Sequence, residues 1–175
     1  ELVQHLDGKT YPQTAAYLAS LTNTPKASSM VHQTHMTKAF RPFTKSLTLN
    51  ASTPWLKKKG IASLTAKRFE AGAYDAPGFL NGCIGVRLHD LHGHPIGYAG
   101  RRRHPKQAQL YGKWKLPPAL PKSALLYNFH RVSSYTHKGL VIVEGPRAAM
   151  RLAQLNIPAV ALLGIHLSPT QQHLL

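Results

Sequence analysis

LVIVEGPRAAMRLAQLNIPAVALLG, residues 140–164, is the stretch that decides the fold. Residues 140–145 are a continuous β-branched apolar run that ends at a glycine, which predicts a buried strand. Pro146 suits the first position of a following helix, and residues 158–164 predict a second buried strand. Two such strands joined by a crossover helix predict a parallel sheet that is covered on both faces. The sequence therefore predicts an α/β core from about Leu140 onward.

The residues before this unit predict short helices and an antiparallel hairpin. Residues 52–61 and 64–72 each have the caps of a short helix, and Gly72 is expected to close the second one. Two apolar runs in 83–103 flank a turn that contains aspartate and glycine, which is typical of a hairpin. This part is predicted to be an α+β N-terminal subdomain with a small antiparallel sheet.

The sequence divides into three segments by composition. Segment 1–45 is expected to be a helix over 10–20 followed by a basic linker, the tail of another domain. Segment 46–138 is expected to be a basic subdomain, and segment 139–175 the beginning of the α/β domain. Since the chain starts with Glu1 in place of methionine and stops within a predicted helix, we expect a fragment of a longer protein.

The charge of the chain points to a polyanionic partner. The sequence has 22 Lys and Arg against 6 Asp and Glu, a formal net charge of +16, with 43% hydrophobic residues. Nucleic acid fits this balance best. An anionic membrane surface is the alternative, but no apolar run reaches the roughly 18 residues of a spanning helix, and no basic amphipathic helix stands out.

A basic stretch between Leu91 and Gly139 contains no acidic residue. Several lysines and arginines on one segment give sequence-independent affinity for phosphates, and interleaved aromatic rings stack on unpaired bases. A solvated basic face with core aromatics is the alternative. The candidate nucleic-acid-binding residues are Arg101, Arg102, Arg103, Lys106, Lys113, Trp114, Lys115 and Lys122.

Glu144 is the only carboxylate after Asp90 and directly follows a predicted buried strand. In open α/β sheets, ligands and catalytic groups collect at the carboxyl ends of the strands. A carboxylate there can help to bind Mg²⁺ or transfer a proton during attack on a phosphate. The alternative is a glutamate that caps a helix or forms an ion pair. Glu144 is therefore the candidate catalytic and metal-binding residue.

Other chemistry finds little support in the sequence. His32 and His35 have metal-ligand spacing, but no cysteine accompanies them, and Cys83 is the only cysteine. This argues against structural zinc and excludes an internal disulfide. The P-loop, dinucleotide-binding and serine-hydrolase motifs are absent as well.

The predicted elements, taken in order, resemble a known family. Residues 140–164 resemble the opening of the Toprim domain that bacterial primases and topoisomerases share. The hairpin over 84–102 and the segment KWKLPPALPKSALLYNFHR are similar to the parts that precede this domain in DnaG-type primases. The resemblance covers about residues 52–175 and is nearest to primase-like proteins with an N-terminal CHC2 zinc finger.

The resemblance implies synthesis of a short RNA primer on single-stranded DNA from nucleoside triphosphates. It places Glu144 at the Toprim glutamate, which holds Mg²⁺ or Mn²⁺ together with a later Asp-x-Asp cluster. It also places Lys113 and Lys122 near template or nucleotide, and Arg101 at the end of the hairpin. A replicative helicase is a candidate partner, and the bacterial cytoplasm the expected location. The departure is that no aspartate follows Glu144.

Two other functions stay open. A non-catalytic nucleic-acid-binding module of a mobile element or phage would retain the scaffold without the missing aspartates. A Toprim-type strand-cleaving enzyme would keep the fold and change the reaction. The leading hypothesis is a fragment of a primase-like nucleotidyltransferase. The fragment alone is expected to bind single-stranded DNA in a salt-dependent way but to make no primers.

Overall fold

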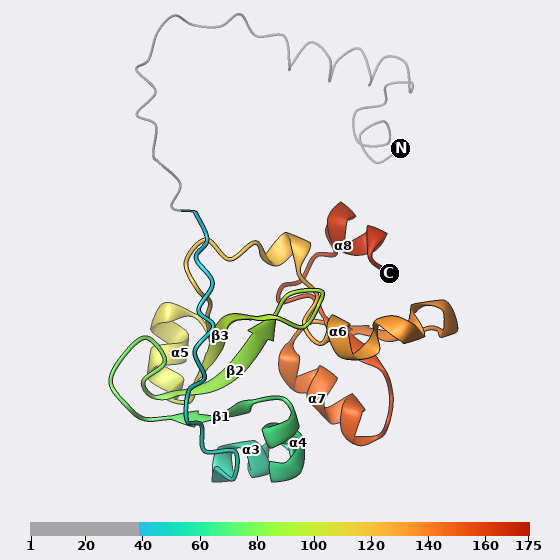
Figure 1. The fold of residues 1–175 in the computed structure, drawn as a ribbon. Helices are drawn as coiled ribbons and strands as arrows, with labels where there is room; N and C mark the ends of the chain where they lie inside the picture. The colour runs from blue at the N-terminus through green and yellow to red at the C-terminus, as the bar shows by residue number, and fades with distance from the viewer. Residues whose placement is uncertain (1–38) are drawn as a thin grey trace, which may run out of the picture. The chain divides into compact units, whose positions relative to one another are not determined.

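The computed structural model describes residues 39–175, which belong to one compact unit (Figure 1). The helix predicted over 10–20 and most of the predicted linker lie outside the described residues. An antiparallel sheet and a smaller parallel sheet, with helices packed around them, form the fold. This confirms the α/β class with an α+β part before the parallel strands. None of the helices described is both long and apolar enough to cross a membrane.

The antiparallel sheet contains four strands in sequence order. They are β1 (Ala71–Tyr74), β2 (Cys83–His89), β3 (Pro95–Arg102) and β4 (Trp114–Lys115). The predicted hairpin is confirmed, because β2 and β3 pair antiparallel, with one shift of register between Leu88 and His89. Its turn is closed by the Asp90 backbone N–H, which donates to the His94 carbonyl at 2.9 Å.

One face of this sheet carries the main core. Ile84, Val86 and Leu88 alternate along β2 and are all buried. They pack against helices α3 (Pro54–Lys58) and α4 (Ser63–Arg68), which confirms both predicted helices. The same cluster includes Met150 and other residues that follow position 138, so one core joins the two sides of the predicted subdomain boundary. The division into subdomains at 138 stays a prediction.

The opposite face of the sheet is crossed by residues 39–50 (Figure 1). Backbone N–H groups of this segment donate to the Ile96 carbonyl, from Phe43, and to the Tyr98 hydroxyl, from Leu47, each at 3.0 Å. Arg87, only 2% exposed, donates from both terminal nitrogens to the carbonyls of this segment. Its guanidinium lies 4.6 Å from the centre of the Tyr98 ring. A buried arginine therefore holds the segment on the sheet.

Gly72 does not close a helix, which corrects the prediction from the sequence. Helix α4 ends at Arg68, and Glu70 turns the chain with a φ of 48°. Gly72 lies inside β1, where a Cβ atom would come within 2.6 Å of the Asn50 backbone. The glycine is there because another stretch of backbone passes too close for any side chain.

The smaller sheet confirms the predicted parallel unit. Strands β5 (Val141–Val143) and β6 (Ala159–Ala161) pair in parallel and are joined by helix α7 (Pro146–Gln154), which begins at Pro146. β6 is buried, but Val141 and Ile142 of β5 are 41% and 43% exposed. The expected cover on both faces is therefore wrong for β5, which is also an edge strand within residues 39–175.

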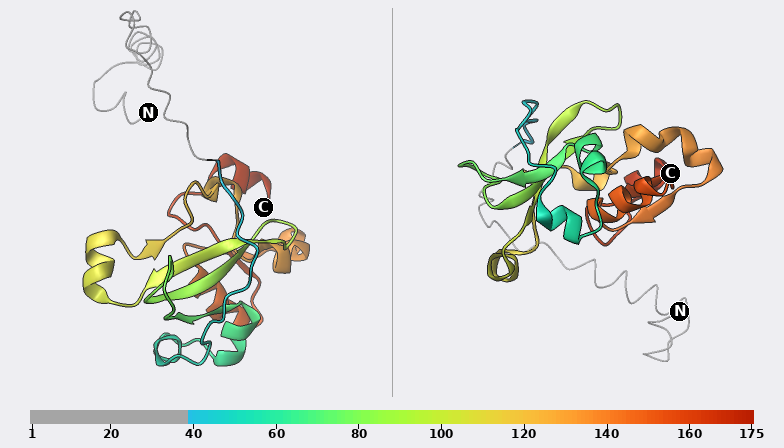
Figure 2. Two further views of the ribbon diagram at one scale, coloured as in Figure 1. Left: turned by 60° about the vertical axis from the view of Figure 1, so that its left-hand side comes forward. Right: turned by 90° about the horizontal axis from the view of Figure 1, so that it is seen from below.

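Short helices complete the described fold. They are α5 (Pro105–Tyr111), the 3-10 helices η1 (Lys122–Ala124) and η2 (Ser133–Lys138), α6 (Phe129–Val132) and α8 (Pro169–His173). Helix α5 buries none of its side chains and stands away from the sheets (Figure 2). Gln171 of α8 is buried and donates to the Leu125 carbonyl at 2.7 Å, which holds the last helix against the segment after η1.

Two histidines meet where the hairpin approaches α6. The rings of His89 and His130 lie 4.5 Å apart, and His89 Nε2 lies 3.0 Å from Glu70 Oε2. Burial, helped by the positive charge of Arg131, lowers the pKa of His130 to about 4. Burial and Arg131 also lower the pKa of His89. The folded protein therefore resists protonation of both rings, although Glu70 partly offsets this for His89.

Folding stability is expected to fall as the pH drops from about 6.5 toward 4. The unfolded chain binds protons on these rings near their ordinary pKa, whereas the folded chain resists protonation, so acid favours unfolding. After allowance for solvent screening we expect His130 to account for about 1–2 kcal/mol. Urea unfolding at a series of pH values measures this, with His130→Gln as the comparison. An unchanged pH dependence in His130→Gln would contradict it.

Candidate nucleic-acid interface

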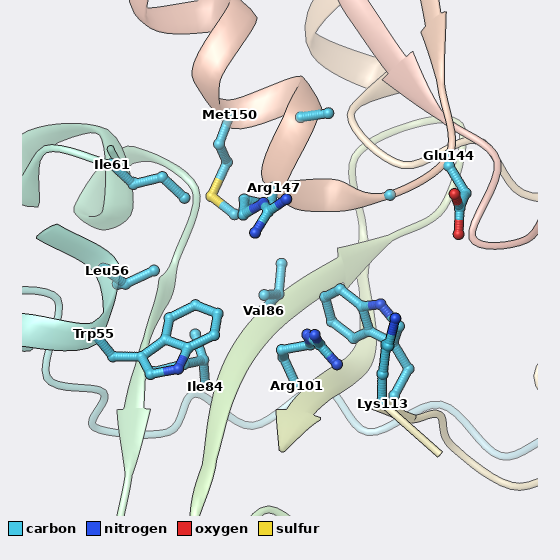
Figure 3. A pocket seen from close by; sticks show the side chains of 13 residues that line it. Trp55, Leu56, Ile61, Ile84, Val86, Arg101, Lys113, Glu144, Arg147 and Met150 are labelled. Carbon is cyan, nitrogen blue, oxygen red and sulfur yellow. The ribbon is translucent and has the colours of Figure 1, made fainter. Parts of the chain in front are cut away.

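A cleft lies between the core face of the antiparallel sheet and the first turns of α7 (Figure 3). Its volume is about 310 Å³. Apolar side chains from α3, the loop after it, β2 and α7 form its floor and one wall, so the cleft is anchored in the main core. These side chains are Trp55, Leu56, Ile61, Ile84, Val86, Ala148 and Met150.

Three cations from separate elements line the cleft. Arg101 comes from β3, Lys113 from the residue before β4, and Arg147 from the first turn of α7 (Figure 3). Burial lowers the pKa of the Arg101 guanidinium, and the positive charge of Arg147 lowers it further. Arginine nevertheless stays charged in proteins. The two guanidinium groups thus repel each other across a shared space.

Arg101 also has a donor without a partner. Its Nη1 atom is buried, and no described residue accepts a hydrogen bond from it. Its guanidinium lies 5.9 Å from the centre of the Trp114 ring, the residue that pairs with it between β3 and β4. A buried cationic donor left unpaired is costly, whereas an anion in the cleft would satisfy it.

Glu144 lies at the edge of the same cleft. It follows β5 and is exposed, and its carboxylate is drawn on the opposite side from Trp55 (Figure 3). It also lines a second hollow of about 90 Å³, together with Trp114 and Leu163. Glu144 is the one carboxylate among the residues that line the larger cleft. Three positive charges against one negative charge make this an anion-attracting site.

Comparison with known proteins finds primases by sequence and by fold. No protein-family description matches the chain. A stretch of 86 residues is 36% identical to the DNA primase of Mycoplasma pneumoniae. This stretch covers 49% of this chain and 14% of that protein. The Aquifex aeolicus primase structure, with its zinc-binding and RNA polymerase domains, matches with a TM-score of 0.59 and 20% identity over 69% of this chain and 38% of that one. The catalytic domain of DnaG primase bound to single-stranded DNA matches with a TM-score of 0.57 and 22% identity over 74% of this chain and 52% of that one. The fold is that of a DnaG-type primase core.

The likeness to a DnaG-type core covers a part of each relative. The chain spans 14% of the curated DNA primase and 38% and 52% of the two structures. At 20% and 22% identity the structures show a shared fold. The resemblance inferred from the sequence is thereby confirmed at the level of the DnaG-type fold, and the chemistry has to be argued from the cleft.

Four of the predicted site residues meet at the cleft of this DnaG-type fold, namely Arg101, Lys113, Trp114 and Glu144. Two others are held by the protein instead. Arg102 donates to the Gly112 carbonyl at 2.7 Å and to the Trp114 carbonyl at 3.2 Å, so it closes the loop between β3 and β4. Arg103 forms an ion pair with Asp75. A nucleic-acid role for Arg102 and Arg103 stays a prediction.

The remaining predicted lysines point elsewhere. Lys115 lies over the Phe79 ring at 4.6 Å, next to a different hollow that Phe79 lines. Lys106 is exposed on α5, and Lys122 is exposed in η1. None of these three lines the cleft beside Glu144. Their contact with nucleic acid also stays a prediction.

Arg147 and Trp55 also line the cleft, although neither was predicted from the sequence. The position of Arg147 could have been predicted, because a crossover helix starts at the same sheet edge where the preceding strand ends. Glu144 follows β5 and Arg147 lies in the first turn of α7, so the chain places both near that edge. Trp55 gave no comparable signal, since it reaches the cleft only through the packing of α3 on β2.

The described residues do not complete a divalent-metal site at Glu144. Mg²⁺ prefers several oxygen ligands, usually including carboxylates, whereas this cleft offers one carboxylate among three cations. Within residues 39–175, no three side chains of His, Cys, Asp or Glu come together. The Mg²⁺ or Mn²⁺ implied by the resemblance would need ligands from elsewhere, so its role stays a prediction.

Proposed function

We propose that this chain is the nucleic-acid-binding part of a primase-type nucleotidyltransferase and that single-stranded DNA binds at the cleft. The observation that carries the proposal is the convergence of Arg101, Lys113 and Arg147 beside Trp114 in this fold. A relative with the same fold has single-stranded DNA bound in its structure.

The cleft offers two kinds of contact that unpaired nucleic acid requires. Its cations neutralise backbone phosphates, which gives affinity for any base sequence. Trp114 and Trp55, which both line the cleft, offer aromatic surfaces on which bases stack. Glu144 repels phosphates from its own edge of the cleft, and this favours a strand that runs past the cations with a sugar or a terminal hydroxyl nearest the carboxylate.

Lys113→Gln tests this proposal with Lys106→Gln as its control. Both lysines are exposed and belong to the basic stretch, but only Lys113 lines the cleft. We expect Lys113→Gln to weaken binding of an oligo(dT) strand about threefold to tenfold and to reduce the salt slope by about 0.7. Lys106→Gln should change the affinity less than about twofold. Fluorescence anisotropy at several salt concentrations measures both.

Equal losses in Lys113→Gln and Lys106→Gln would show that the basic stretch binds DNA diffusely and would reject the cleft. Absence of salt-dependent binding by the unaltered chain would reject the proposal altogether.

For the complete protein, the proposal extends to RNA primer synthesis. Glu144 would then act as the Toprim glutamate, and Mg²⁺ or Mn²⁺ would be held by it together with carboxylates outside residues 39–175. Nucleoside triphosphates would be the substrates, a replicative helicase a partner, and the bacterial cytoplasm the location. The 36% identity to a DNA primase over 86 residues supports this extension.

A non-catalytic nucleic-acid-binding module is the second candidate function. The lone carboxylate in the cleft favours it, because nucleotidyl transfer normally needs a complete set of metal ligands. A primer-synthesis assay with the complete protein separates the two. Primer products would reject the module, and their absence with intact DNA binding would reject the enzyme.

A further inference from the structure

Packing of the fold does not explain why an arginine stands at position 147 in the cleft. It is exposed and lies one residue after Pro146, whose ring fixes the start of α7. In Figure 3 its side chain lies above Val86, while Arg101 lies below Val86, and both arginines line the same cleft. An exposed arginine that faces another arginine, with solvent available elsewhere, indicates that something anionic fits between them.

We propose that Arg147, together with Arg101 and Lys113, binds a phosphate group in the cleft without the help of a divalent cation. This inference rests on the proposed function and deepens it. It adds Arg147 to the residues that bind the phosphate, and it assigns neutralisation of the phosphate to side chains instead of a metal ion. The phosphate can belong to a nucleotide or to a DNA strand, since both present the same group to the three cations.

The chemistry of the three side chains favours phosphate. Two guanidinium forks match the oxygens of a phosphate, and a lysine supplies a third, point-like charge. The buried Nη1 donor of Arg101 gains the partner that it lacks in the protein. Helix α7 begins at Pro146, so the backbone N–H of Arg147 belongs to its first turn, where N–H groups have no acceptor within the helix.

The same charges disfavour a divalent cation at this point. A cation of charge +2 placed among Arg101, Lys113 and Arg147 would meet three positive groups and the single carboxylate of Glu144. In this cleft the guanidinium of Arg147 supplies the positive charge that a metal ion brings to phosphates elsewhere. Phosphate binding is therefore expected to persist when divalent cations are removed.

Arg147→Gln tests the inference, with Arg151→Gln as the matched control. Both arginines are exposed on α7, but Arg151 does not line the cleft. The probe is inorganic tripolyphosphate, and calorimetry with the unaltered chain is run once in EDTA and once in Mg²⁺. We expect binding in EDTA that Mg²⁺ does not strengthen. Arg147→Gln should weaken it about tenfold, and Arg151→Gln less than about twofold.

Competition then identifies the source of the phosphate. If tripolyphosphate displaces a labelled oligo(dT) from the chain, the DNA backbone occupies the cleft. If the two bind together, the cleft takes a nucleotide phosphate. Binding that requires Mg²⁺, or equal losses in Arg147→Gln and Arg151→Gln, would overturn the inference. The inference would also be overturned if tripolyphosphate and oligo(dT) did not displace each other but an acidic peptide displaced both.

These outcomes are separable from a failure of the proposed function. If DNA binds with the dependence on Lys113 described above while Arg147→Gln behaves like Arg151→Gln, the proposed function stands and this inference falls. If tripolyphosphate binds through Arg147 while single-stranded DNA does not bind, the reverse holds.

Discussion

Replacement of Arg87 by alanine is expected to lower the free energy of unfolding by about 3–5 kcal/mol. The side chain is 2% exposed, and its two terminal nitrogens donate to the carbonyls of Thr44 and Lys45. Truncation leaves both carbonyls without a partner, opens a cavity beneath Tyr98, and releases the segment that crosses the sheet. Urea unfolding followed by circular dichroism measures the loss.

Arg102→Ala is the control for this prediction. Arg102 also donates to two backbone carbonyls, but it is half-buried at the end of β3. Water can reach the carbonyls that it leaves, so we expect a loss of only about 1 kcal/mol. Equal losses in the two variants would mean that burial of Arg87 contributes nothing beyond its hydrogen bonds.

Replacement of Glu144 by glutamine is expected to separate binding from synthesis. The change removes the only negative charge that lines the cleft, beside three cations. Binding of single-stranded DNA by the chain should therefore be retained and tightened about twofold to fivefold at low salt. In the complete protein, primer synthesis should fall by a factor on the order of 10²–10³, because a carboxamide no longer serves as an anionic ligand or proton acceptor.

Anisotropy titrations and a primer-extension assay with labelled nucleotides measure the two effects. Glu70→Gln is the control, since Glu70 is paired with His89 away from the cleft. Weaker DNA binding by Glu144→Gln would contradict the electrostatic account of the cleft. Full synthesis by Glu144→Gln would show that Glu144 has no part in catalysis.

The parallel unit and the hairpin were predictable because their signals are local. A β-branched run, a proline at the first helical position and a glycine at each strand end define β5, α7 and β6 from neighbouring residues alone. Gly72 and the exposed face of β5 were not predictable. The first depends on Asn50, which is distant in sequence. The second depends on how the rest of residues 39–175 packs around β5, which has one strand neighbour among them.

Most residues of the candidate site were among those predicted from the sequence. Which of the predicted residues meet at the cleft was not predictable. Charge and the position of Glu144 indicated the right segments, yet the eight predicted basic and aromatic residues could not be ranked without the sheet. Arg101 and Arg102 are adjacent, so the alternation of a strand sends their side chains to opposite faces. One reaches the cleft and the other closes a loop, although the sequence presents them as equivalent.

The open side of β5 also affects how this chain behaves at high concentration. Its outer backbone groups have no neighbouring strand in the described part of the fold, and two branched apolar side chains beside them are in contact with water. Such an edge is a template for any extended segment that can supply a matching row of N–H and C=O groups. Concentrated samples of this chain would therefore be prone to self-association along β5, where a lysine on the strand would suppress it.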